Sequence, residues 1–448
     1  MDFSAFKQAV ISTAKEQGIT EYELYYKAAE STTVSTFKNE LNQFTSAIDG
    51  GVCFRCIVDG KMGYASTEAL SDEQAASIVS RAADNARTLE SEDPVFLGEG
   101  GQFYEPLERE QYPLPSTEQL IHTALDAQAK LYASDERVVD GCETRCIAEK
   151  EIVSIYNSKG LDLSYENNIA GLVVSSVVSD GGEMEDDYEI KLGSLEKLDL
   201  DEMAAKATKG ALEKLGGDVA PTGNYPVVFS PEAMASLLAT YSSVFSAEAA
   251  QKGLSKLAGR EGERVASPLV TLVDDPFHKE SPTPINFDAE GSPAHCKNVI
   301  QNGVLKTLLY NLKTAAVAGK TTTGNASKAN YNSAVTVRPF TMYLAPGEMT
   351  EAQLLEKAGN GVFINSLGGL HAGANPISGD FSLQSAGFMI ENGVKAAHVK
   401  SFTVAGNFFD LLENITAAAK NVKLPNAMGM TSFGAPSVLV EGLSIAGK

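Results

Sequence analysis

The segment 371–393, HAGANPISGDFSLQSAGFMIENG, holds the densest group of side chains that could take part in chemistry. Its His371, Ser378 and Asp380 are the residue types of a serine-type catalytic triad, but the sequence alone does not place them in a hydrogen-bonded line. Ser378 and Asp380 also flank Gly379, a pattern common in tight turns. Three interpretations therefore stay open: a serine-type triad, contact with an extended ligand, and turn chemistry alone.

Metal-binding and nucleotide-binding spacings are absent from the chain. The histidines are too far apart in sequence for HExxH or HxxxH, and GxSxG, a Walker A loop and GxGxxG are also missing. His278 has Asp274, Asp275 and Glu280 near it in sequence, which leaves a metal site or an ordinary loop histidine as alternatives. The acidic run EMEDD, residues 183–187, is expected to be a solvated turn in a loop.

The number of cysteines indicates reduced thiols rather than disulfide bonds. There are 5 of them, an odd number in a long chain, which does not suit a disulfide framework. Cys53 and Cys56 form a CxxC inside the strand-like run GVCFRCIV, where positions i and i+3 point to opposite faces. We therefore expect two buried thiols there rather than a redox or zinc pair.

Charge and hydrophobicity indicate which partners and which cellular location to expect. A formal net charge of −22 repels phosphate backbones, so we expect no nucleic-acid partner. The N-terminus lacks a signal-peptide core, and no apolar run reaches the roughly 20 residues of a membrane span. These observations predict a cytoplasmic protein without membrane association.

The N-terminal half repeats one order of elements. In residues 1–100 a helix is followed by strand-like runs and a second helix capped at Ser71. Residues 101–221 repeat this order, beginning with a helix capped at Ser116. The runs VSTF and VSIY occupy matching places in the two units, which indicates a weak internal duplication.

The character of the chain changes near residue 222. A helix start at Ser230-Pro231-Glu232 is followed by an apolar helical stripe, and beyond it strands and turns dominate. The predicted fold class is α+β: two related helix–strands–helix units, then a larger β-rich domain over residues 222–448 with mixed or antiparallel sheets.

The C-terminal half resembles the TldD/PmbA family of bacterial and archaeal peptidase-related proteins. Three runs occur in the family's order: INFDAEGSPAHCKNVIQNGVLKTLLYNLKTAAVAG, TTTGNASKANY and GLHAGANPISGDFSLQSAGFMIENGV. The two N-terminal units resemble the family more loosely. By this resemblance, HAGANPISGDF is a family signature around a cleft rather than a self-contained triad.

The family has two branches, which differ in their metal ligands. TldD-like members carry a zinc-binding HExxxH helix and a further cysteine ligand near the C-terminus, whereas PmbA-like members, also called TldE, lack both and pair with a TldD-like subunit. In this chain GERVAS resembles the run that follows the zinc helix, and counting back places the degenerate window on Ala239, Thr240 and Val244. No histidine lies between His122 and His278.

The resemblance therefore implies a PmbA/TldE-like subunit of a cytoplasmic metallopeptidase system, inactive alone. We expect no catalytic residue, metal or other cofactor in this chain, because a TldD-like partner would supply the zinc and the general base. The expected partners are that subunit and unfolded peptide, in a homo- or hetero-oligomer. The candidate residues lining the peptide chamber are His371, Asn375, Ser378, Asp380 and Asn392.

Two alternatives remain. The chain could be an independent peptidase or hydrolase with an unrecognised site around residues 371–380. It could instead be a protein-binding regulator without catalysis, since the family has also carried the name modulator of DNA gyrase.

Overall fold

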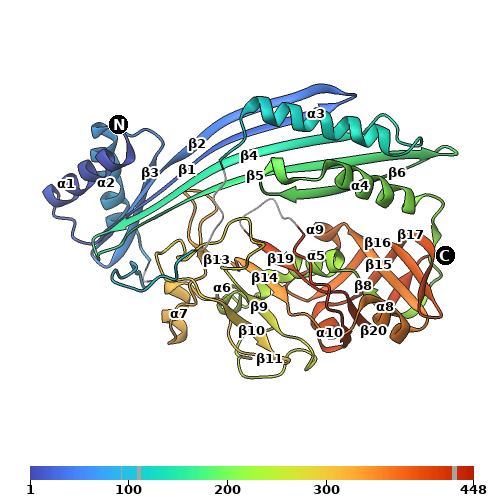
Figure 1. Ribbon diagram of the computed structural model, residues 1–448. Coiled ribbons are helices and arrows are strands. Elements are labelled where there is room, and N and C mark those ends of the chain that lie inside the picture. The colour runs from blue at the N-terminus through green and yellow to red at the C-terminus, as the bar shows by residue number, and fades with distance from the viewer. Residues whose placement is uncertain (92, 108–112, 426–430) are drawn as a thin grey trace.

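The N-terminal half of the protein builds one antiparallel six-stranded sheet (Figure 1). The structure is a computed structural model that describes residues 1–91, 93–107, 113–425 and 431–448. Strand order is β3-β2-β1-β4-β5-β6, so the strands of both N-terminal units share one sheet. The strands are β1 (Tyr22–Phe37), β2 (Glu40–Val58), β3 (Lys61–Thr67), β4 (Glu143–Asn157), β5 (Asp162–Asp180) and β6 (Glu183–Leu192).

Each unit contributes helix, three strands and helix, as the sequence predicts. The helices are α1 (Phe3–Glu16), α2 (Asp72–Thr88), α3 (Thr117–Ser134) and α4 (Leu200–Lys214), with the short 3₁₀ turn η1 (Leu195–Lys197) before α4. The two units meet at the antiparallel pair β1–β4, where Glu30 lies opposite Lys150. This arrangement agrees with an internal duplication, which stays a hypothesis.

The six-stranded sheet is covered differently on its two faces. One face packs against α1 and α2 at one end and α3 and α4 at the other. The opposite face meets the C-terminal region through a cluster that includes Tyr25 and Cys53 from the sheet and Phe287 and Tyr331 from beyond it. Cys56 lies on the helix-covered face, so the prediction that Cys53 and Cys56 are buried on opposite faces is confirmed.

One sequence expectation about this sheet is wrong. The acidic run 183–187 is not a loop, because it forms the first half of the edge strand β6. Its residues pair with the end of β5, where Glu183 lies opposite Asp180 and Glu185 opposite Val178. Its position at the sheet edge tolerates this charge density, and Glu183 and Glu185 form ion pairs with Lys400 of the C-terminal region.

The β-rich C-terminal region contains two larger sheets, which confirms the α+β class. Strand order is β11-β10-β9-β14-β19 in the five-stranded sheet and β18-β20-β8-β15-β16-β17-β7 in the seven-stranded sheet. The first sheet comprises β9 (Leu272–Asp274), β10 (Lys297–Gln301), β11 (Val304–Leu305), β14 (Thr341–Leu344) and β19 (Ser432–Gly434). The second comprises β7 (Asp218–Val219), β8 (Gly223–Phe229), β15 (Gly361–Gly368), β16 (Asp380–Glu391), β17 (Val394–Asn407), β18 (Ile415–Ala418) and β20 (Val438–Ala446).

Short helices pack around these sheets. They are α5 (Pro231–Tyr241), η2 (Ser242–Phe245), α6 (Ala247–Gln251), α7 (Leu312–Ala318), α8 (Glu351–Ala358), α9 (Leu370–Gly373) and α10 (Phe408–Glu413), and β12 (Ala326–Ser327) pairs separately with β13 (Thr336–Val337). In Figure 1, α9 and α5 lie on the side of the C-terminal region that is turned toward the six-stranded sheet. Among the described residues, no helix has both the length and the apolar character needed to cross a membrane.

Candidate functional site

Helix α5 occupies the position that the family resemblance assigns to the zinc helix. It begins as the sequence predicts, because the Ser230 side chain accepts a hydrogen bond from the Ala233 N–H and Pro231 fills the first turn. Val244, in η2, is fully buried, and the Thr240 hydroxyl donates to the Ser236 carbonyl of its own helix. The side chains at these positions offer only methyl groups and one hydroxyl that already donates within its own helix. A zinc ligand set is therefore not formed by Ala239, Thr240 and Val244.

Tyr241 connects the end of α5 to the candidate segment. Its ring stacks on Phe408 with centroids 4.5 Å apart and planes 6° from parallel. Its hydroxyl donates to the Asp380 carbonyl oxygen over 2.7 Å. Burial raises the pKa of Tyr241 to about 12, so the phenol stays protonated and keeps donating at neutral pH.

Residues 375–380 form a closed turn stabilised by Asn375. The Asn375 side-chain oxygen accepts from the Ile377 N–H at 3.0 Å and from the Ser378 N–H at 3.3 Å. The Asn375 N–H donates to the Asp380 carbonyl at 2.9 Å, and the Gly379 N–H donates to the Asn375 carbonyl at 2.8 Å. The backbone of this turn is therefore fixed by its own hydrogen bonds.

Asn407 ties the turn to the start of α10. Its side-chain amide donates to the Ser378 carbonyl at 2.8 Å and to Asp380 Oδ1 at 2.9 Å. Gly379 has a φ of 82°, and a Cβ there would lie 2.5 Å from the Phe409 ring, so this position requires glycine. The Asn407 amide and the Ser378 hydroxyl hold the pKa of the exposed Asp380 carboxyl below its usual range.

The structure brings together some of the sequence-predicted residues and separates one. Asn375, Ser378 and Asp380 lie in one turn, and the exposed His371 lies just before it in α9. Asn392 lies at the other end of β16, in the hairpin turn to β17, where its N–H donates to the Asn360 side chain. Asn392 is thus a turn residue with a φ of 50°, remote from the other four along the strand.

The bonds of the turn do not form a serine-type triad. Ser378 Oγ accepts from the Asp380 N–H at 3.3 Å, and Asp380 Oδ1 accepts from Asn407. In the part of the chain that the structure describes, no hydrogen bond or ion pair involves the His371 side chain. Of the three interpretations, these bonds exclude the triad and leave ligand contact and turn chemistry alone.

Sequence reasoning missed two residues that organise the site. The sequence places Tyr241 only in the apolar helical stripe that follows Ser230, and its hydroxyl bond to Asp380 reaches across 139 positions. Asn407 precedes the helix-forming run FFDLLE, and its side chain accepts from the Phe409 N–H as an N-cap. That capping position was the one local signal available for Asn407.

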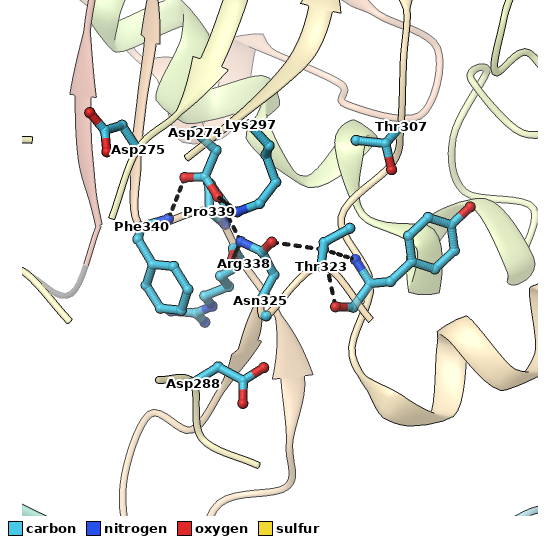
Figure 2. Close-up of polar contacts among 12 residues, drawn as sticks. Asp274, Asp275, Asp288, Lys297, Thr307, Thr323, Asn325, Arg338, Pro339 and Phe340 are labelled. Atoms are coloured by element: carbon cyan, nitrogen blue, oxygen red, sulfur yellow. Dashed lines mark hydrogen bonds and ion pairs between the residues drawn. The ribbon is translucent and has the colours of Figure 1, made fainter. Parts of the chain in front are cut away.

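Asp274, one of the acidic neighbours of His278, belongs to a buried polar network of its own (Figure 2). The fully buried Asp274 accepts from Lys297 Nζ at 3.1 Å, from the Asn325 side chain at 2.7 Å and from the Phe340 N–H at 2.8 Å. Figure 2 shows the Asp275 side chain directed away from this network. The His278 ring packs on Tyr343, and its Nδ1 accepts from the Glu280 N–H, which is typical of a loop histidine.

A second buried polar cluster joins the six-stranded sheet to the C-terminal region. Arg55 Nε donates to Glu23 Oε1 at 2.7 Å, and Arg55 Nη1 lies 4.0 Å from Glu290 Oε1. The three side chains are at most 6% exposed. This cluster therefore holds two halves of the chain together with charges removed from water.

Asp288 lies next to this cluster. Its carboxylate accepts from the N–H groups of Glu290, Ser292 and Ala326, each at 2.9 Å. Burial, with the negative charge of Glu290, raises the pKa of Asp288 to about 7 in spite of these donors. A cavity of about 30 Å³ beside Asp288 and Lys328 has room for roughly one water molecule.

A further cleft lies elsewhere. Its volume is about 510 Å³, and it is lined by Glu105, Pro106, Leu107, Phe277, Pro284, His295 and Cys296. Burial lowers the pKa of His295 and raises that of Cys296. These two residues come from the loop before β10 and are separate from the turn at residues 375–380.

Family models match most of the chain in three successive stretches. Residues 22–86 match domain 1 of the PmbA/TldA metallopeptidases, residues 111–215 match their central domain, and residues 222–447 match their C-terminal domain.

Curated relatives agree with these matches. The chain is 26% identical over 410 residues to an uncharacterized protein of Methanocaldococcus jannaschii, covering 91% of this chain and 93% of that protein. It is 24% identical over 456 residues to metalloprotease PmbA of Escherichia coli O157:H7, covering 98% and 96%. A TldD homologue of Buchnera aphidicola is 26% identical, and that alignment covers 55% of this chain and 53% of the homologue.

Two solved structures share the fold along nearly the whole chain. A proposed modulator of a DNA gyrase from Thermotoga maritima superposes with a TM-score of 0.88 and 33% identity, covering 99% of this chain and 100% of that one. TldE from Thermococcus kodakarensis also gives a TM-score of 0.88 with the same coverage. Its identity is 23%, so this second likeness concerns the fold alone.

Proposed function

The chain belongs to the PmbA/TldD metallopeptidase family, and from this premise we propose that it is a subunit without zinc ligands that forms a peptide-binding wall. In this proposal a TldD-like partner supplies the zinc and the general base. Unfolded peptide is the substrate, and residues 371–380 contact it.

The observation that carries the proposal is the packing at the end of α5. A zinc peptidase needs imidazole ligands, an open coordination position and a carboxylate that accepts the proton of the attacking water. At the matching positions this chain has Ala239, Thr240 and Val244, and the adjacent Tyr241 is engaged with Phe408 and Asp380. The residues present do not fit zinc, so we derive no catalytic step in this chain.

The turn at residues 375–380 supports a role in peptide contact. An extended peptide binds best to donors and acceptors whose positions are already fixed, because little conformational entropy is then lost on binding. Asn375, Asn407 and Tyr241 fix the turn, while the side chains of His371 and Asp380 are exposed. A peptide could therefore meet an imidazole and a carboxylate on a rigid support.

The first experiment measures zinc per chain on protein purified without a metal-affinity tag, together with hydrolysis of an unfolded peptide. We expect no stoichiometric zinc, no turnover by the chain alone and turnover when a zinc-bearing TldD-like chain is added. Robust turnover by the isolated chain would contradict the proposal and would favour the alternative that the chain is an independent hydrolase. Replacing His371 or Ser378 with Ala would then test that alternative.

A second measurement addresses the peptide-binding wall. Asp380→Asn in the mixed system is expected to raise KM, because the variant keeps the shape of the side chain but loses its charge. Asp410→Asn, a change to an exposed acid on α10, serves as the matched control. An unchanged KM for Asp380→Asn would show that Asp380 does not contact the peptide.

A further inference from the structure

The acidic run at the start of β6 contacts the C-terminal region of the same chain. Lys400 of β17 forms ion pairs with Glu183 and Glu185. The N–H of Gly216, just after α4, donates to the second carboxylate oxygen of Glu183 at 3.0 Å. Figure 1 shows β6, α4 and β17 at the same end of the molecule. This contact therefore joins the β6 edge of the six-stranded sheet to the seven-stranded sheet.

His398 lies beside this contact. It precedes Lys400 by two positions on β17, which places the two side chains on the same face of the strand. The His398 ring meets the Phe388 ring edge-on, with centroids 5.2 Å apart. A Cβ on Gly217 would lie 2.3 Å from His398 Nδ1, so the segment that leaves α4 passes directly over the ring.

Both nitrogens of the His398 ring are shielded from solvent, and neither has a hydrogen-bond partner among the described residues. A neutral imidazole has one N–H, whereas a protonated imidazole has two. Protonation therefore adds a buried charge and a second unpaired donor at this position, which costs free energy. Burial accordingly lowers the pKa of His398, and the positive charge of Lys400 lowers it further.

The charged groups around the ring decide what its protonation does. They are Lys400 on β17, Glu185 on β6, Lys214 and Glu213 at the end of α4, and Asp218 on the neighbouring strand β7. Each of the three acids already pairs with a lysine: Glu185 with Lys400, Glu213 with Lys209 and Asp218 with Lys448. A protonated ring can therefore gain an acceptor only in competition with an existing ion pair.

We propose that His398 makes the contact between β6 and β17 an acid-sensitive latch within the chain. At neutral pH the ring is uncharged, and Lys400 holds Glu183 and Glu185. When the ring takes up a proton, it either stays buried without an acceptor or draws Glu185 away from Lys400, and both outcomes weaken the contact. Acidification therefore releases the β6 edge from the seven-stranded sheet, while the buried cluster around Arg55 still joins the two halves of the chain.

The latch is closed at neutral pH and opens as pH falls. A histidine whose pKa is lowered in the closed form destabilises that form as pH falls from the ordinary value of about 6.5 through the lowered value. The contact is therefore fully present above about pH 6.5. A difference of one pKa unit between the closed and open forms corresponds to about a tenfold change in the ratio of open to closed molecules.

The test measures the distance between two spin labels by double electron–electron resonance. The labels are attached at Asp186→Cys on β6 and Val394→Cys on β17, two positions with exposed side chains, and the exposed Cys296 is replaced with Ser. We expect one distance at about pH 7.5 and a longer, broader distribution at about pH 5.5. An NMR titration of the His398 ring should give a pKa below the ordinary value.

Three changes in the labelled chain isolate the role of the ring. His398→Phe keeps an aromatic ring against Phe388 but takes up no proton, so it should keep the closed distance at both pH values. His398→Asn, smaller and also without a titration in this range, should do the same. His122→Phe, a change to an exposed histidine on α3, is the matched control and should open as the unaltered chain does.

Lys400→Met removes the cation of the latch and should show the open distance at both pH values. An unaltered chain that keeps the closed distance at about pH 5.5 would overturn the proposal, as would a folded His398→Phe or His398→Asn chain that opens like the unaltered one. A closed Lys400→Met chain would also overturn it, because the ion pairs would then not hold the edge. The proposal does not rest on the proposed function, since the measurement needs neither a zinc-bearing partner nor a peptide.

Discussion

The Tyr241 hydroxyl donates to the Asp380 carbonyl oxygen, which also accepts the N–H of Asn375. One carbonyl thus joins the end of α5 to the turn at residues 375–380. The Tyr241 ring stacks on Phe408 at the start of α10, so three segments distant in sequence are held at one point. The end of α5 therefore supports the turn through the Tyr241 side chain.

Tyr241→Phe separates the hydrogen bond from the stacking. The variant keeps the ring on Phe408 but removes the donor, and Asp380 O still has the Asn375 N–H. We expect a loss of about 1 kcal/mol in the free energy of unfolding. Tyr241→Ala also removes a fully buried ring and is expected to cost about 3–5 kcal/mol. Urea unfolding measures both values, and equal losses in the two variants would contradict this division.

Asn407→Ser tests the electrostatic tie to Asp380. Serine retains an oxygen that can cap α10, but it lacks the amide that donates to Asp380 Oδ1. Because this donor contributes most to lowering the pKa of Asp380, that pKa is expected to rise toward its ordinary value in the variant. A carboxyl-detected NMR titration measures it directly.

The sign of the accompanying pH dependence follows from linkage. A carboxyl whose folded-state pKa is depressed contributes stability above its unfolded pKa of about 3.9, and this contribution is lost as pH falls through the folded pKa. Stability between pH 5 and pH 2 should therefore fall less steeply in Asn407→Ser than in the unaltered chain. Identical Asp380 titration curves in the two proteins would show that the amide is not the cause.

Local features of the sequence predicted much of the fold. Ser71 and Ser116 cap the helices that the sequence places after them, and α5 begins at Pro231 as Ser230-Pro231-Glu232 predicts. Such signals depend on a few neighbouring residues, so a single sequence is enough to read them.

The long-range features could not be predicted in the same way. The two N-terminal units merge into one sheet because Glu23 pairs with Asn157 and Phe37 with Glu143, and no local pattern specifies this pairing. The bond from Tyr241 to Asp380 depends equally on the folded chain. One available signal was overlooked: Arg55 lies in the middle of the apolar strand GVCFRCIV, where a charge requires a buried partner.

Asp288→Asn tests the buried carboxyl beside the interface between the sheet and the C-terminal region. Because the folded-state pKa of Asp288 is raised to about 7, the folded protein holds a proton that the unfolded chain releases near pH 4. This group therefore makes stability fall as pH rises from about 4 to about 7, and the asparagine variant should lack that part of the decline.

The measurement for Asp288 is urea unfolding at several pH values between 4.5 and 8. The charged and polar groups facing Asp288 include Glu290, Lys328 and Tyr25, and all of them remain in the variant. The difference in unfolding free energy between the two proteins should therefore change with pH because of Asp288 itself. Parallel pH profiles would mean that Asp288 is ionised in the folded protein throughout this range.

Arg55→Met tests the buried charges that join the two halves of the chain. The substitution leaves the carboxylates of Glu23 and Glu290 buried without their cation, and we expect a loss of about 3–5 kcal/mol in the free energy of unfolding. The matched control is Arg87→Met, because Arg87 pairs with Asp84 on the surface with side chains 53% and 73% exposed. That exposed pair is expected to contribute no more than about 1 kcal/mol.

Adding Glu23→Gln to Arg55→Met removes one of the unpaired charges and should recover part of the loss. If Arg55→Met cost no more than Arg87→Met, water would have to reach the buried carboxylates, and the interface would not depend on this ion pair.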